Sequence, residues 1–136
     1  MRKPITPFAH GIIDYLTVAT VAAAPKLMDF PEEASNACYT LAALYAGTSM
    51  MTDYPLGVRR ALPFKAHGFA EVAIGALLPA LPFVLGFAGD RRARNFFLGL
   101  TALTAMTAAM TDWDRKSDRI ARRRHKRKPR LVGRAA

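Results

Sequence analysis

The sequence contains a single cysteine, Cys38, and few acidic residues. With one cysteine no disulfide can form within the chain, so cysteine usage does not indicate an oxidising compartment. Asp and Glu number 10 against 20 Lys and Arg, and the excess is unevenly placed. Residues 112–136 hold 11 Lys and Arg against 3 Asp, whereas residues 1–111 hold 9 against 7. The basic charge therefore describes a tail, and the body of the chain is close to neutral.

Long stretches of the body contain few charged residues. Four segments, at 8–27, 34–54, 66–87 and 93–113, have about the 20 residues that a helix needs to cross a hydrocarbon core of about 30 Å. A soluble four-helix bundle would need a polar outer stripe on each helix, and residues 98–109 show none. The sequence therefore predicts an all-α bundle of four transmembrane helices. The expected organisation is a membrane domain over residues 1–111, followed by a basic cytoplasmic tail over residues 114–136.

The chain repeats itself once, which indicates two tandem helical hairpins. The clearest match lies at the ends of the halves, where residues 51–54 read Met-Thr-Asp-Tyr and residues 110–113 read Met-Thr-Asp-Trp. Each half also begins with Ala-His-Gly and has a carboxylate four residues after the His. The predicted repeats span about 4–54 and 63–113. Because each hairpin returns the chain to its starting side, the two hairpins should have parallel topology.

The charges of the loops predict the orientation in the membrane. The N-terminal lead, the loop between the repeats and the tail hold most of the Lys and Arg residues, and such segments stay in the cytoplasm. Both termini are therefore expected on the cytoplasmic side of a bacterial plasma (inner) membrane. Arg91, Arg92 and Arg94 disagree with this orientation, since they are expected in the loop of the second hairpin on the opposite side.

Paired hairpins that open on a His with an acid four residues later, and that carry a proline near the far end, resemble the SPW-repeat family of small bacterial integral membrane proteins. The likeness covers about residues 4–113. The Ser-Pro-Trp motif that names the family is reduced to its proline, since residues 24–26 read Ala-Pro-Lys and residues 81–83 read Leu-Pro-Phe. The resemblance implies a four-helix membrane fold, and it implies no particular reaction or ligand.

Six ionisable residues are predicted to gather in the cytoplasmic half of this bundle. Residues four apart share a helix face, so each His should lie over the carboxylate of its own helix. Isolated charges are costly inside a membrane, and such residues usually face the bundle interior and pair with one another. The six candidate residues are His10, Asp14, His67, Glu71, Asp53 and Asp112.

Three interpretations of these residues remain open. The sequence favours a structural one, in which the pairs join the hairpins of a non-enzymatic membrane protein with a structural or accessory role and no cofactor. In the second, His10, His67, Asp14 and Glu71 bind a divalent metal or serve a transporter, because imidazole and carboxylate suit Zn, Mn or Fe. In the third, the cluster acts on a lipid or a quinone, although so short a chain leaves little room for an acyl-donor cavity.

The basic tail is expected to contact anionic lipid headgroups at the cytoplasmic surface. Its dense like charge predicts disorder from about Ala121. It has neither interleaved aromatic residues nor a nucleic-acid-binding motif. The expected partners are therefore the lipid bilayer and, within it, a second copy of the chain or another membrane protein. The headgroup candidates are Arg122, Arg123, Arg124, Lys126, Arg127 and Lys128.

Overall fold

A computed structural model describes residues 2–115 of the chain, and these form helices without a β-strand. The predicted all-α class is confirmed. The helices are α1 (Pro7–Leu27), α2 (Glu32–Met51), α3 (Phe64–Leu77), α4 (Leu81–Val84) and α5 (Arg91–Met110). The predicted headgroup-binding run and the disorder expected from about Ala121 lie outside the described residues.

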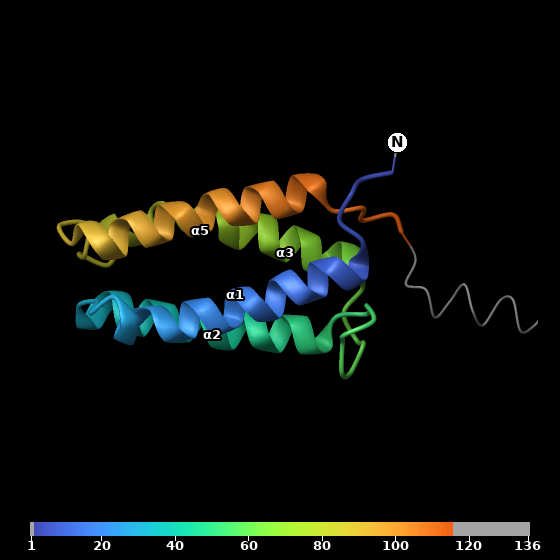
Figure 1. The fold of residues 1–136 in the computed structure, drawn as a ribbon, viewed down its shortest axis with the longest axis horizontal. Helices are drawn as coiled ribbons and strands as arrows, with labels where there is room; N and C mark the ends of the chain where they lie inside the picture. Colours follow the sequence, from blue (N-terminus) through green and yellow to red (C-terminus); the bar gives the residue numbers. More distant parts are fainter. Residues whose placement is uncertain (1, 116–136) are drawn as a thin grey trace, which may run out of the picture.

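The helices form two hairpins that lie side by side (Figure 1). Helices α1 and α2 make the first hairpin, and α3, α4 and α5 make the second. The start of α1, the segment between the hairpins and the end of α5 all lie at the same end of the molecule (Figure 1). We call this the terminal end, and the opposite end, where each hairpin turns, the loop end.

The third predicted helix, at 66–87, is interrupted. Helix α3 ends at Leu77, and a turn leads into the four-residue α4. Pro79 accounts for the break, because proline lacks the N–H that would bond the carbonyl of Gly75 and its ring clashes with that carbonyl. The 14 residues of α3 span about 21 Å, which is less than the thickness of a hydrocarbon core. Within the described residues, α1 is the one helix both long and apolar enough to cross a membrane.

Helices α2 and α5 both begin and end two to three residues earlier than predicted. Asp90 caps α5, since its Oδ1 accepts a hydrogen bond of 2.8 Å from the Ala93 amide. Arg91 and Arg92 therefore lie in the first turn of α5 and not in a loop, as was expected. At their other ends, the helices stop because Thr52 and Thr111 adopt extended backbone.

The interior of the molecule changes character along its length. Closest packing occurs within each hairpin, between α1 and α2 and between α3 and α5. Toward the loop end the interior is apolar and includes Val21, Cys38 and Phe97. At the terminal end the most deeply buried side chains include the two histidines and several threonines. The buried polar residues of the fold, including both candidate histidines, are thus concentrated at the terminal end.

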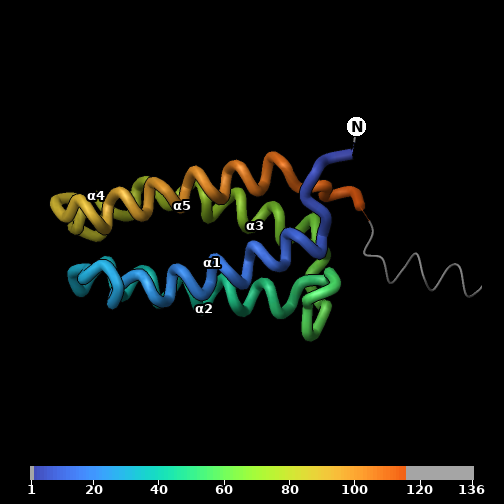
Figure 2. Tube along the Cα trace, in the orientation of Figure 1, coloured from blue at the N-terminus to red at the C-terminus, as the bar shows by residue number. Residues whose placement is uncertain are grey.

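Two short backbone bridges join chain segments at the terminal end. Figure 2 shows the segment before α1 running beside the end of α5 there. Ile5, which precedes α1, pairs with Thr111, and Leu62, which precedes α3, pairs with Thr52. The Asp112 amide donates to Ile5 at 2.9 Å, and the Asp53 amide donates to Leu62 at 2.7 Å. Each threonine that ends a hairpin is therefore fixed beside the start of the other hairpin, Thr111 beside α1 and Thr52 beside α3.

Candidate functional site

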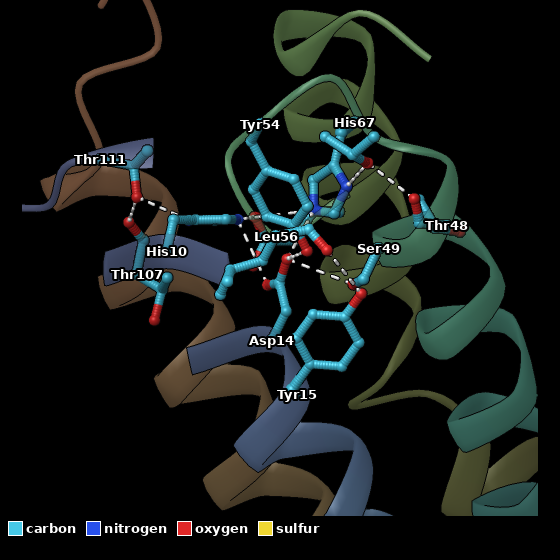
Figure 3. A network of polar contacts seen from close by, with 12 residues as sticks. His10, Asp14, Tyr15, Thr48, Ser49, Tyr54, Leu56, His67, Thr107 and Thr111 are labelled. Carbon is cyan, nitrogen blue, oxygen red and sulfur yellow. Dashed lines mark hydrogen bonds and ion pairs between the residues drawn. The ribbon is translucent and has the colours of Figure 1, made fainter. Parts of the chain in front are cut away.

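One histidine from each repeat reaches the same point inside the terminal end (Figure 3). His10 Nε2 lies 3.4 Å from His67 Nε2, and the two rings are nearly perpendicular, at 80°. Both side chains are almost completely buried, with exposed fractions of 0% and 1%. The equivalent histidines of the two repeats, recognised from the sequence, therefore lie in contact with each other.

Two carboxylates approach this pair. Asp14 Oδ1 lies 3.3 Å from His10 Nε2, and Asp14 Oδ2 lies 3.5 Å from His67 Nε2. Glu71 Oε2 lies 3.5 Å from His10 Nε2. The sequence predicted the contact of His10 with Asp14, but it placed Glu71 over His67 of the same helix. In the structure, Glu71 approaches the histidine of the other repeat, so the contacts cross between the hairpins.

The two carboxylates differ in their own partners. Asp14 Oδ2 accepts hydrogen bonds from Ser49 Oγ at 3.2 Å and from the Tyr54 hydroxyl at 3.1 Å (Figure 3). Glu71 Oε2 is buried and has no hydrogen-bond partner among the described residues. Asp14 is thus held in a fixed orientation, whereas Glu71 Oε2, without a hydrogen-bond partner among the described residues, lies beside His10.

The other nitrogen of each imidazole faces a threonine. His10 Nδ1 lies 2.9 Å from Thr111 Oγ1, and His67 Nδ1 lies 2.7 Å from Thr52 Oγ1. Sequence reasoning missed both threonines, although they occupy the same position of the duplicated Met-Thr-Asp-aromatic motif. The duplication itself was the signal that could have identified them.

Asp53 and Asp112, the remaining sequence candidates, do not join the cluster. They follow the last residues of α2 and α5 and are partly exposed. What they contribute is the backbone N–H of each cross-bridge. Because the helices end one turn earlier than predicted, the threonine before each aspartate takes the inward position.

Aromatic rings cover the cluster at the terminal end. The Trp113 and His10 ring centroids lie 4.9 Å apart, and those of Phe64 and His10 lie 5.4 Å apart. The glycine that follows each His makes room for this cover. A Cβ at Gly11 would lie 2.6 Å from Tyr54, and one at Gly68 would lie 2.8 Å from Trp113. The Ala-His-Gly motif therefore supplies a ligand-type side chain and the space for the ring beside it.

Fixed positive charge is found at the rim of the site and not inside it. Lys65 hydrogen-bonds Asp114 and lowers the pKa of that exposed carboxyl group. No Lys or Arg within residues 2–115 pairs with Asp14 or Glu71. Two buried carboxylates thus face two imidazoles without a resident Lys or Arg. Buried charge requires such compensation, and here it must come from protons or from a bound cation.

No family model, curated protein or solved structure matches this chain.

Proposed function

We propose that this protein is a small helical membrane protein that binds one divalent transition metal ion, with Zn²⁺ as the preferred ion. The ligands are His10 and His67 through Nε2, together with the carboxylates of Asp14 and Glu71. The observation that carries the proposal is the convergence of His10, His67 and Asp14 at one buried point, with Glu71 Oε2 beside His10. Three of them, His10, Asp14 and His67, present candidate ligand atoms that all lie within 4.8 Å of one another.

The spacing of the ligand atoms around His10 Nε2 is close to that around a tetrahedral ion. Zinc bonds of about 2.0–2.1 Å place neighbouring ligand atoms of a tetrahedron about 3.3 Å apart. His10 Nε2 lies at about this spacing from three of the other ligand atoms, 3.3 Å from Asp14 Oδ1, 3.4 Å from His67 Nε2 and 3.5 Å from Glu71 Oε2. Two imidazole nitrogens with two carboxylate oxygens also suit Mn²⁺ and Fe²⁺. We favour zinc among these ions because the approaches to His10 Nε2 are close to the ligand spacing of tetrahedral zinc.

The charge of the cluster supports the same conclusion. A divalent cation would neutralise both carboxylates in a place where no described Lys or Arg pairs with them. It would also give Glu71 Oε2, which has no partner among the described residues, a bonding partner. Buried polar atoms in native proteins are nearly always satisfied, so an unpaired carboxylate oxygen calls for an explanation.

Elemental analysis of the purified protein tests the proposal. The chain should be extracted with detergent from washed membranes and purified without a metal-affinity tag. We expect about one zinc ion per chain after dialysis, because four buried ligands hold the ion against exchange. Glu71→Gln should lose most of this metal, whereas Glu33→Gln, an exposed site on α2, should retain it. Wild-type protein without stoichiometric metal, even when zinc is supplied during growth, would contradict the proposal.

The membrane location is part of the proposal and has its own support. Large apolar side chains are exposed on every long helix, among them Leu16, Leu44, Phe69 and Met106. Exposed apolar surface of this extent is typical of a protein that contacts lipid. The four-span topology, the place in the SPW-repeat family and the inner membrane remain proposals, as do lipid headgroups as partners of the tail.

The orientation can be tested with reporter fusions. We expect a reporter fused after Ala136 to be active in the cytoplasm, because the positively charged segments gather at the terminal end. A reporter fused between Asp29 and Glu32, at the loop end of the first hairpin, should be active only outside the cell. An externally active fusion after Ala136 would contradict cytoplasmic termini.

A structural or accessory role without metal is the second candidate. Each hairpin packs most closely within itself, and the cluster joins α1 of one to α3 of the other. On this reading, the cluster is what holds the hairpins together. It predicts that loss of the histidines lowers thermal stability equally in metal-free and metal-supplemented samples. No enzymatic reaction is proposed for the chain.

A further inference from the structure

We infer that Thr52 and Thr111 are positioning residues of the metal site: each fixes the tautomer of the other repeat's histidine, so that both imidazoles present an Nε2 lone pair to one ion. The inference rests on the proposed metal-binding function for its purpose. Its geometric basis, two hydroxyl groups each placed between an imidazole and a helix carbonyl, stands on the structure alone.

The direction of each hydrogen bond follows from counting protons. A threonine hydroxyl carries one proton. Thr111 Oγ1 donates it to the Thr107 carbonyl at 2.7 Å (Figure 3). Thr52 Oγ1 donates it to the Thr48 carbonyl at 2.6 Å. Each hydroxyl oxygen can then only accept from the imidazole beside it. With both hydroxyl protons donated to the carbonyls, the proton of each of these bonds lies on Nδ1 of the histidine.

This proton placement determines what the two rings offer to a ligand. A neutral imidazole that carries its proton on Nδ1 has its lone pair on Nε2. The two Nε2 atoms face each other at 3.4 Å, beside the carboxylates of Asp14 and Glu71. Histidines that bind metals usually donate their other N–H to an oxygen partner, which fixes tautomer and ring orientation. Thr52 and Thr111 supply that partner here.

The fold explains why threonines occupy these two positions. Each one ends a helix and is held by a backbone bridge, Thr111 to Ile5 and Thr52 to Leu62. The bridge brings the hydroxyl group to the histidine of the other repeat. The aromatic residue two positions later instead covers the glycine of its own repeat. The duplicated Met-Thr-Asp-aromatic motif thus contributes to both hairpins, and neither hairpin alone can complete the site.

The tautomers can be measured without any metal. In metal-free, detergent-solubilised protein labelled with ¹⁵N-histidine, NMR should show a proton on Nδ1 of both His10 and His67. This is the less common form of a neutral imidazole in water, so solvent exposure would not produce it. Thr111→Val should change the ¹⁵N pattern of His10 and leave that of His67, and Thr52→Val should do the reverse. Unprotonated Nδ1 atoms in the wild-type protein would overturn the inference.

The effect on the metal is measured by competition with a chromophoric chelator. Thr52→Val and Thr111→Val should each weaken Zn²⁺ binding by about 10–100-fold, the usual effect of losing an outer partner of a metal ligand. Serine at either position keeps the hydroxyl group and should restore most of the affinity. If these threonines only filled space, valine, which has the shape of threonine, would preserve Zn²⁺ binding better than the smaller serine. We expect the opposite order.

Matched controls exist on the same helices. Thr48 and Thr101 also bond the carbonyl four residues earlier, at 2.8 and 2.9 Å, and neither contacts a histidine. Thr48→Val and Thr101→Val should bind Zn²⁺ as the wild type does, and the Co²⁺-substituted proteins should share its visible spectrum. The valine variants at Thr52 and Thr111 should shift the Co²⁺ spectrum, because the orientation of one imidazole changes.

The outcomes separate the two proposals. A wild-type protein that binds zinc while both valine variants retain full affinity overturns the role of the threonines and leaves the metal site in place. A wild-type protein that binds no metal overturns the proposed function, and the ¹⁵N spectrum of the wild type still decides the tautomers. If a valine variant does not fold, this wild-type spectrum decides the inference by itself.

Discussion

Alanine at both His10 and His67 is expected to weaken Zn²⁺ binding by more than about a thousandfold. Loss of a single outer partner costs about 10–100-fold, and this double substitution removes two direct ligands. What remains is a pair of carboxylates, a donor set that suits Mg²⁺ or Ca²⁺ better than zinc. The measurement is a competition titration of purified, detergent-solubilised protein against a chelator of known affinity.

The sequence offers a control for this experiment in its third histidine, His125, which lies outside the described residues. His125→Ala should bind zinc as tightly as the wild type, so that any zinc held by the basic tail is accounted for. The single variants His10→Ala and His67→Ala should fall between the wild type and the double variant. Wild-type affinity in the double variant would place the metal elsewhere and contradict the proposed site.

The second large effect is expected on stability. Asp14→Ala should lower the free energy of unfolding by about 3–5 kcal/mol, the range observed when one partner of a buried ion pair is removed. Asp14 is only 2% exposed and is the acceptor for Ser49 Oγ and the Tyr54 hydroxyl. Alanine would leave these two donors without their acceptor, remove a ligand beside both imidazoles and open a cavity. Unfolding by a denaturing detergent, followed by circular dichroism, measures the change.

Two further variants make this prediction specific. Asp114→Ala removes an exposed carboxylate whose partner Lys65 is itself largely solvated, and its unfolding midpoint should match that of the wild type. Asp14→Asn keeps an acceptor oxygen for Ser49 and Tyr54 but lacks a charge for the metal. It should therefore recover part of the stability without recovering zinc binding. An Asp14→Ala protein as stable as the wild type would show that the cluster contributes little to the fold.

Most of the secondary structure could be predicted from local patterns. Apolar runs of about helical span length and the duplicated motifs located three of the four long helices to within three residues. The break after α3 was missed, because the apolar composition of 66–87 continues through Pro79 and Pro82. The ends of α2 and α5 were placed too late, because nothing in the residue types shows that Thr52 and Thr111 leave helical backbone to form cross-bridges.

The sequence predicted most of the residues that form the candidate site, but only some of the contacts between them. His10, Asp14, His67 and Glu71 were chosen because ionisable groups in apolar helices must find partners, and the structure places all four together. The helical spacing of four residues suggested partners within each helix. The actual partner of Glu71 is His10, which depends on how one hairpin lies against the other. Asp53 and Asp112 were chosen for their charge, but the neutral threonines before them face inward.

The sequence by itself determined that this chain is helical, that it is built from two similar hairpins, and that each hairpin brings one histidine and one carboxylate. These features depend on composition and on local spacing, which a linear pattern records. The tertiary structure decided that the contacts cross between the repeats and that two threonine hydroxyl groups orient the imidazoles. Such contacts join residues from different helices, 15 positions apart for Thr52 and His67 and 101 positions apart for His10 and Thr111. They follow from the packing of helices and the cross-bridges, which no local pattern encodes.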